Sequence, residues 1–542
     1  MWNYIKLLNR YFQTLRHLKF IQLFFRLKYI FPKKNNSVVR ENLLTRKYIN
    51  PTWLKSKKEV SFNGTKFNFL NIQKEFTDTI WSSKSGDPLW DYNLHYFNFL
   101  NDASQDINIK LVNSWINNTF YGKGVAYEPY PTSLRIVNLI KWTTSTKNSN
   151  KKIHKSIYLQ SRWLLNNLEW HLLANHLFAN AKALVFSGYL FETEESKRWL
   201  RKGKKIIASQ LKEQVLRDGA HFELSPMYQN IFIADLMDLF HLNRIFLDMH
   251  DEPFEKILLK TIQKMLIWSE DLTHPDNEIA FFNDAALNVA PTLIELQSYF
   301  STFLKLNKSN VQRVKFLSDS GFARINLGSW SAILNLGDIR PDYNPGHAHA
   351  DSLSFELSYN QERLFVNSGT SVYGNSNLRA FQRGTSAHNT VEIDNINSSD
   401  VWHGFRVGRR AKNFGTKIFK DQKKIKVISS HNGYKRLFCG NIHQREWLFL
   451  ENEIAINDKL SGKIVNSISR IYLHPNILII DQAQRHIKVQ LNSGQKIQIN
   501  IEENDFSIKN SYYYWAFGKK TKNKCIEIKL ENNLSMVKVL AI

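Results

Sequence analysis

The sequence predicts a multidomain α+β protein with a helical domain followed by an antiparallel sheet domain. Apolar residues recur at helical spacing up to about residue 308, and after that point they alternate with polar residues in short runs. Helices and strands are therefore segregated along the chain, which excludes a doubly wound α/β fold. At 542 residues the chain is too long for one ordinary core. We expect a lead-in over 1–80, a helical domain over 81–308 and a sheet domain over 309–542.

The helical signals are clearest between residues 175 and 240. A stripe of Leu177, Ala181, Leu184 and Gly188 begins directly after Asn175-His176, which places Asn175 near a helix start. Further helices are expected around 90–96, 134–142, 225–240, 254–268 and 290–306. About ten helices in succession are compatible with a toroid of helical hairpins.

Short alternating runs, with turn residues between them, predict the strands. One hairpin is expected in the lead-in, around Asn63-Gly64, and another at Asn492-Ser493-Gly494. The remaining strands are expected at 330–336, 353–359, 363–366, 390–393, 424–428, 453–456, 477–480, 487–491 and 497–501.

The net charge of the chain limits the class of binding partner that we expect. The formal net charge of +25 favours a polyanion, which could be nucleic acid, anionic lipid or an acidic polysaccharide. Zinc-finger, RRM, P-loop and helix-turn-helix signatures are missing, so we expect no nucleic-acid partner. With Cys439 and Cys525 as the only cysteines, neither a disulfide framework nor a thiolate cluster is expected.

The N-terminal segment reads as a basic amphipathic helix or helix pair. Basic residues interrupt its apolar runs, so we read neither a cleavable signal peptide nor a membrane span of roughly 20 residues. Packing against the main body is favoured over binding to a membrane surface. A cytoplasmic location follows as the expectation.

Two closely spaced histidines form the first candidate site. Residues 344–351 read Asn-Pro-Gly-His-Ala-His-Ala-Asp, so His347 and His349 follow a Pro-Gly turn and precede an alternating run. We expect both imidazoles on or beside the first pleats of a strand, where a sheet meets a cleft. His388 lies downstream in Ser-Ala-His-Asn-Thr. Ordinary polar loop positions are the alternative interpretation.

Tyrosines and polar residues at helix starts are further candidates. Ser225 is a predicted N-cap and Pro226 the first helical residue, so Tyr228 falls in the first turn. The partial positive charge there would favour a phenolate; a core tyrosine with a bonded hydroxyl is equally compatible. Four more residues at expected helix entrances could face the same cleft: Tyr92, His95, Tyr127 and Glu128.

The collinear set of these motifs closely resembles the heparinase II/III-like family of polysaccharide lyases. The resemblance covers most of the chain from about Trp90 to His474 and is strongest between 344 and 411. It is carried by Asn175-His176, Tyr228, Gly346 to Phe355, Gly369-Thr370 with Tyr373, Arg379 to Val391, and Trp402 to Arg406.

The resemblance implies an N-terminal (α/α) toroid joined to a C-terminal antiparallel β-sandwich, with an acidic polysaccharide in the cleft. Family members cleave at O4 of a uronic acid by β-elimination. The carboxylate must be neutralised, a base must take the C5 proton, and an acid must protonate O4. By position, Asn175 is expected to neutralise the carboxylate, with His176 adjacent. Tyr228 is expected as acid, or acid and base together, and His347 as base.

The family also implies a structural metal, with zinc the first candidate and no cofactor needed for the chemistry. His349 and His388 match two of its ligands. Asn367 stands where an acidic ligand is expected, which weakens the donor set.

Four further residues are candidates for holding substrate at the cleft. Arg383 and Arg406 could grip carboxylates or sulfates, and Trp402 with His403 could form a sugar-stacking rim. Ordinary ion pairs and a buried tryptophan are the alternatives. The competing functions are a non-catalytic acidic-polysaccharide-binding protein of a capsule or exopolysaccharide pathway, and a generic polyanion binder. Relatives are commonly exported, so a periplasmic location is the family-based alternative.

Overall fold

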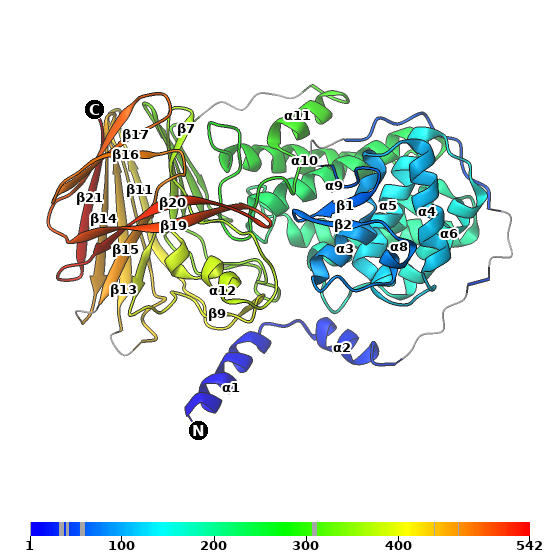
Figure 1. Cartoon of the computed structure of the whole chain (residues 1–542), viewed down its shortest axis with the longest axis horizontal. Coiled ribbons are helices and arrows are strands. Elements are labelled where there is room, and N and C mark those ends of the chain that lie inside the picture. The colour runs from blue at the N-terminus through cyan, green and yellow to red at the C-terminus, as the bar shows by residue number, and fades with distance from the viewer. Residues whose placement is uncertain are drawn as a thin grey trace.

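The computed structural model describes residues 2–31, 37–38, 43–54, 60–305, 312–437, 440–463 and 466–542, with side chains from residue 7 onward. A helical body and a group of antiparallel sheets lie side by side (Figure 1). The segregation of helices and strands is as predicted. The expected domain boundary at 308 falls outside the described residues; the last helix of the body ends at Ser301 and the next strand begins at Val314.

The helical body has one continuous core. Helix α7 contacts α5, α8 and α9, so its residues are buried almost all round. The helices of the body are α3 (Pro88–Tyr96), α4 (Gln105–Asn118), α5 (Pro129–Thr146), α6 (Lys151–Asn166), α7 (Ala174–Leu190), α8 (Glu194–Gln214), α9 (Pro226–Ile245), α10 (Glu252–Asp271) and α11 (Leu293–Ser301).

The lead-in hairpin turns at a different place from the one expected. Strands β1 (Lys66–Phe69) and β2 (Ile72–Glu75) join at Leu70 and Asn71, which both have positive φ angles of 56° and 63°. The side chain of Asn63 instead accepts the backbone N–H groups of Thr65 and Lys66. Asn63-Gly64 is therefore a local turn before β1.

In the described residues, the C-terminal part contains three larger antiparallel sheets and the short pair β9 (Val401–Trp402) and β10 (Arg406–Val407). The first contains β3 (Val314–Leu317), β4 (Phe322–Leu327), β5 (Trp330–Asn335), β6 (Phe355–Tyr359) and β7 (Glu362–Phe365) in that order. The second has the order β19 (Phe506–Ala516), β20 (Lys519–Lys529), β15 (Ser467–Tyr472) and β8 (Val391–Ile393). The third has the order β11 (Asn413–Lys420), β12 (Ile425–His431), β13 (Ile442–Phe449), β14 (Glu453–Ser461), β21 (Leu534–Ala541), β18 (Lys496–Ile501), β17 (His486–Gln490) and β16 (Leu478–Gln482).

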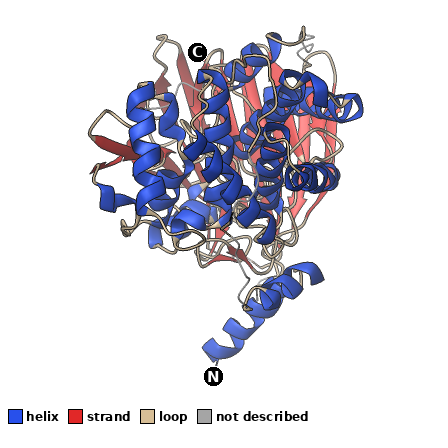
Figure 2. Cartoon of the chain, turned by 90° about the vertical axis from the view of Figure 1, so that its right-hand side faces the viewer, coloured by secondary structure: helices blue, strands red, loops and turns tan. Residues whose placement is uncertain are grey.

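The connections between these strands carry the candidate residues toward the helices. The segment between β5 and β6 holds both histidines of the Pro-Gly turn, and the segment between β7 and β8 includes helix α12 (Asn377–Arg383). Because β6 begins only at Phe355, His347 and His349 lie in a loop and not on strand pleats, which corrects the sequence expectation. Seen from the helical side, the helices cover the sheets (Figure 2).

The N-terminal helices α1 (Trp2–Leu15) and α2 (Phe20–Lys28) lie outside both layers (Figures 1 and 2). Packing against the body was expected, and it holds for one side only. Phe25 stacks on Trp170, with ring centroids 5.8 Å apart, and Tyr11 meets Trp402 edge-on. The large apolar side chains on the other side stay exposed. No helix of the described residues could cross a bilayer.

Candidate active site

A cavity of about 770 Å³ lies where the helices meet the sheets. Asn175, His176, Tyr228, His347 and Tyr92 all line it, although they come from four separate segments of the chain. The folded chain thus brings together the three predicted catalytic residues. The hairpins β1–β2 and β19–β20 border the same cavity and touch each other, since Asn71 donates to the carbonyl oxygen of Phe517 at 2.6 Å.

The carboxylate of Asp284, in the segment after α10, is the centre of the site. It accepts two N–H groups of Arg379, one of them at 2.7 Å, and Nδ1–H of His347 at 2.8 Å and Nε2–H of His349 at 2.9 Å. Both Asp284 and Arg379 are fully buried. Burial alone would raise the pKa of Asp284, but Arg379 and the two histidines outweigh it and hold that pKa well below its ordinary value.

The backbone beside Asp284 ties the two domains together. Asn283 has a φ of 57°; its side chain donates to the carbonyl oxygen of Leu224 at 2.8 Å and accepts the backbone N–H of His349 at 3.1 Å. The carbonyl oxygen of Asp284 accepts the hydroxyl of Ser225 at 2.6 Å. Leu224, with a φ of 55°, is held in the same left-handed region.

The imidazole of His347 is oriented for proton transfer at one nitrogen. Its Nδ1–H points at Asp284, so in the neutral ring the lone pair is on Nε2. The ring lies 4.1 Å from that of Tyr228, centroid to centroid, and its side chain is 16% exposed. His347 therefore faces the cavity beside Tyr228, as the sequence predicted, whereas His349 turns inward toward His388.

The hydroxyl of Tyr228 is held as a phenol. Ser225 caps α9 by accepting the backbone N–H of Tyr228 at 3.2 Å, as predicted. The hydroxyl lies 3.0 Å from that of Tyr373. Burial, followed by the neighbouring Tyr373, raises the pKa of Tyr228 well above its ordinary value. The expectation of a phenolate is thus corrected, because desolvation outweighs the helix dipole.

Strained backbone presents Asn175 and His176 to the cavity. Leu173 and Ala174 precede them with φ angles of 62° and 51°, a region that side chains other than glycine rarely occupy. His176 donates Nδ1–H to Glu169 at 3.0 Å. Burial lowers the pKa of His176, but Glu169 and more distant carboxylates outweigh it and raise the pKa above the ordinary value.

Two residues expected at the cleft belong to the core instead. His95 is buried, and its Nδ1 accepts the indole N–H of Trp115 at 3.2 Å. Tyr127 is buried against Trp115 and Trp163. Of the four candidates at helix entrances, Tyr92 lines the cavity. Its hydroxyl donates to Glu128, which does not line the cavity itself.

The four residues expected to hold substrate at the cleft also lie outside the cavity lining. Arg383 is 1% exposed and donates to the carbonyl oxygens of Ala348 and Gly404, so it holds the loop in place. The guanidinium of Arg406 lies 5.0 Å from the ring of Trp402, at the junction with α1. His403 is exposed beside it. Arg383, Arg406, Trp402 and His403 do not line the cavity; Phe405 is the residue of this loop that does.

The predicted metal ligands His349 and His388 lie together in the interior, and the structural metal stays a prediction. His349 Nδ1 and His388 Nε2 face each other at 3.0 Å. The amide of Asn367 is already used: it donates to the carbonyl oxygen of Phe281 and accepts the backbone N–H of Asn389, both at 3.0 Å. The described residues contain no group of three or more His, Cys, Asp or Glu side chains placed to hold an ion. Two imidazoles and a neutral amide form a weak donor set for zinc, as the sequence indicated.

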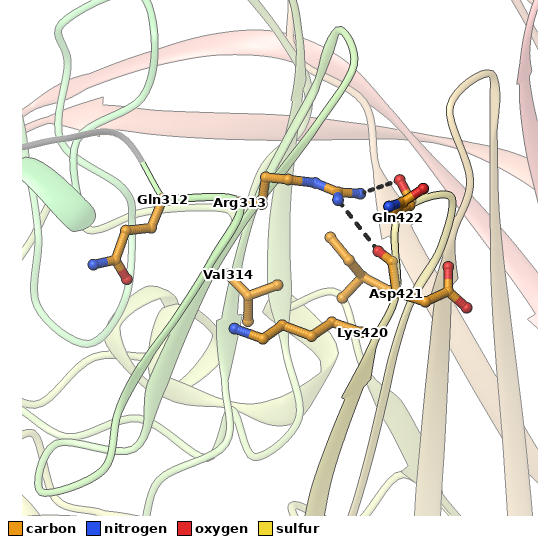
Figure 3. Close-up of a pocket in the computed structure, with 7 residues that line it drawn as sticks. Gln312, Arg313, Val314, Lys420, Asp421 and Gln422 are labelled. Atoms are coloured by element: carbon orange, nitrogen blue, oxygen red, sulfur yellow. Dashed lines mark hydrogen bonds between the residues drawn. The ribbon is translucent and has the colours of Figure 1, made fainter.

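A second pocket, lined by different residues, lies between β3 and the β11–β12 turn (Figure 3). Its Arg313 donates to the backbone carbonyl oxygens of Asp421 and Gln422 at 3.2 and 3.0 Å. These hydrogen bonds give the guanidinium a structural role, and no histidine lines the pocket. The cavity around His347 is the better candidate for chemistry.

Sequence reasoning missed Asp284 and gave no role to Arg379, Tyr373 or Glu169. Asp284 lies in a segment with neither helical nor strand periodicity, and its partners are 63 to 95 residues away. Only the tertiary structure brings them together.

Comparison with known proteins agrees with the fold. Residues 139–310 match the family model "Heparinase II/III N-terminus" and residues 310–536 match "Heparinase II/III-like, C-terminal". A heparin-sulfate lyase of Bacteroides stercoris is 25% identical over 335 residues, 56% of this chain and 46% of that protein. A heparin-sulfate lyase of Pedobacter heparinus is 27% identical over 245 residues, which are 41% of this chain and 36% of that protein. The matched region thus spans less than half of either relative.

Among solved structures, heparinase III superposes with a TM-score of 0.69 at 16% sequence identity, covering 85% of this chain and 79% of that one. That structure combines a helical toroid with a β-sandwich. The predicted architecture of toroid followed by sandwich is confirmed.

Replacing Asp284 by asparagine should destabilise the fold by about 3–5 kcal/mol, because Arg379 would remain buried without a counter-ion. Urea unfolding measures this. Asp319→Asn is the matched control: Asp319 pairs with the exposed Arg217 at 3.0 Å, and its loss should change stability by less than about 1 kcal/mol. Equal stability of the two variants would rule out Asp284 as the essential counter-ion.

Proposed function

This chain belongs to the heparinase II/III-like family, and on that premise we propose that it is a lyase that cleaves an acidic polysaccharide by β-elimination at O4 of a uronic acid. The observation that carries the proposal is the contact of two proton-transfer groups in one cavity: His347, oriented by Asp284, against Tyr228. The names of the relatives point to the same kind of reaction.

We assign each group a step on the basis of this geometry. Nε2 of His347 takes the proton from C5 of the uronate, and Asp284 stabilises the imidazolium that forms. Electrons of the broken C5–H bond form the C4–C5 double bond as the bond from C4 to O4 breaks. Tyr228, which keeps its proton because of its raised pKa, donates it to the leaving O4. Tyr373 lies within hydrogen-bond distance to support that transfer.

The carboxylate of the uronate needs a partner that withdraws its charge. Asn175 and His176 share the same edge of the cavity, and a protonated His176 adds a positive charge there. Both stabilise the negative charge that develops on the carboxylate as C5 loses its proton.

The charges of the cavity favour a polymer of low sulfate density. Its lining lysines are Lys141, Lys182 and Lys519, and its lining aspartates are Asp102, Asp235 and Asp238, so their formal charges cancel. Lys182 is held by Asp235 and Asp238, both at 2.6 Å, and Lys141 by Asp238 at 2.9 Å. Nine asparagines complete this polar lining: Asn68, Asn71, Asn93, Asn98, Asn101, Asn138, Asn175, Asn288 and Asn344. Amides suit sugar hydroxyls, whereas sulfates require unpaired cations.

Removing either proton-transfer group should abolish turnover with little loss of binding. Tyr228→Phe and His347→Gln should each lower kcat by about 10²–10⁴-fold, measured by the absorbance of the unsaturated uronate product. Tyr359→Phe, at the end of β6, is a matched control and should retain full activity. Binding without turnover in the unmodified protein, on every uronic-acid polymer tested, would favour a binding protein over a lyase.

Unsulfated uronic-acid polymers should be better substrates than heparin. We expect kcat/KM to be higher by at least about tenfold, which corresponds to about 1.4 kcal/mol of transition-state stabilisation. A series of polymers with the same uronate and increasing sulfation provides the measurement. Faster cleavage of the most sulfated polymer would contradict the charge argument.

Substrate affinity should fall as the pH rises through the raised pKa of His176. Below that pKa the imidazolium attracts the uronate; above it the neutral ring does not, so KM increases. Glu169→Gln removes the carboxylate that raises this pKa most, so the increase should begin at lower pH. Glu195 pairs with Arg162 outside the cavity, so Glu195→Gln should leave the pH dependence of KM unchanged. A KM that does not vary with pH would exclude His176 as a carboxylate contact.

A further inference from the structure

Each of the two N-terminal helices exposes an apolar stripe. On α1 its members are spaced i, i+1, i+4, i+5 and i+8, and on α2 they are spaced i, i+3, i+4 and i+7, so each set forms one stripe. The side chains are between 39% and 81% exposed: Leu7, Leu8, Tyr11, Phe12 and Leu15 on α1, Phe20, Leu23, Phe24 and Leu27 on α2, with Ile30 and Phe31 after it. Exposed large apolar groups gathered in this way mark an interaction surface.

Contacts on the opposite sides of the helices fix the orientation of these stripes. Arg10 of α1 pairs with Asp400 at 2.8 Å. On α2, Gln22 is buried and Phe25 stacks on Trp170. Both helices are therefore attached to the body by polar and aromatic contacts. Apart from Tyr11, whose ring also contacts Trp402, the side chains of the stripes face away from the body.

The charge of the segment identifies what covers the stripes. Residues 1–31 contain six basic residues and no acidic one. Arg16, Arg26 and Lys28 have no carboxylate partner among the described residues, so they flank the apolar stripes as unpaired cations. A polysaccharide would satisfy these cations but would leave the phenylalanines in water. A membrane interface with anionic headgroups accommodates both.

We propose that α1 and α2 dock this protein onto anionic phospholipid membranes, with the apolar stripes inserted at the level between headgroups and acyl chains. The proposal is independent of the lyase reaction. It also places the cavity near the lipid surface: Tyr11 of α1 contacts Trp402, and Phe405 of the same loop lines the cavity.

Vesicle flotation tests the docking. The full chain is mixed with vesicles of phosphatidylcholine alone or with added phosphatidylglycerol. It should float with the anionic vesicles, less so at high salt, and not with the neutral ones. The double variant Phe12→Asp with Leu27→Asp should bind at least about tenfold more weakly.

The matched control is Phe120→Asp with Leu247→Asp, because these side chains are 74% and 65% exposed on the helical body. It carries the same added charge and should bind vesicles like the unmodified protein. Failure of the unmodified protein to float with anionic vesicles would overturn the proposal, as would unchanged binding of the Phe12/Leu27 variant. A dimer in solution that this variant abolishes, without vesicle binding, would assign the stripes to a second copy of the chain.

Discussion

A single buried negative charge organises this protein. The carboxylate of Asp284 has no access to solvent, yet it stays ionised because Arg379 and two imidazoles surround it. Isolated in the interior, that charge would be too costly to keep. The helical region supplies the carboxylate and the sheet region supplies its partners, so the two regions are held in register by the same contact that orients His347.

This arrangement separates the two histidines of the Pro-Gly turn. They are two residues apart and bind different oxygens of one carboxylate, His347 from the cavity side and His349 from the interior. Strand geometry would have put both rings on one face. Because they lie in a loop, the backbone can turn between them, and one ring remains available for chemistry while the other is enclosed.

Much of the architecture could be predicted from periodicity and capping residues. The start of α9 at Pro226 and the pair β17–β18 follow from local sequence, since caps, turns and alternation involve near neighbours. The burial of Arg383 and His95 could not be predicted, because their partners are backbone carbonyls and an indole from distant segments. Residue type indicated that these side chains were polar but not what they bind.

The strained residues around the cavity have a consequence for the binding of the proposed polysaccharide substrate. Leu173, Ala174, Leu224 and Asn283 hold left-handed conformations before any ligand arrives, fixed by the packing around them. The groups that they present are therefore ordered in advance, and in the proposed reaction the sugar chain would not have to immobilise them. More of the binding free energy would then be available to distort the uronate at the reacting bond, which is the use of binding energy that accelerates a reaction.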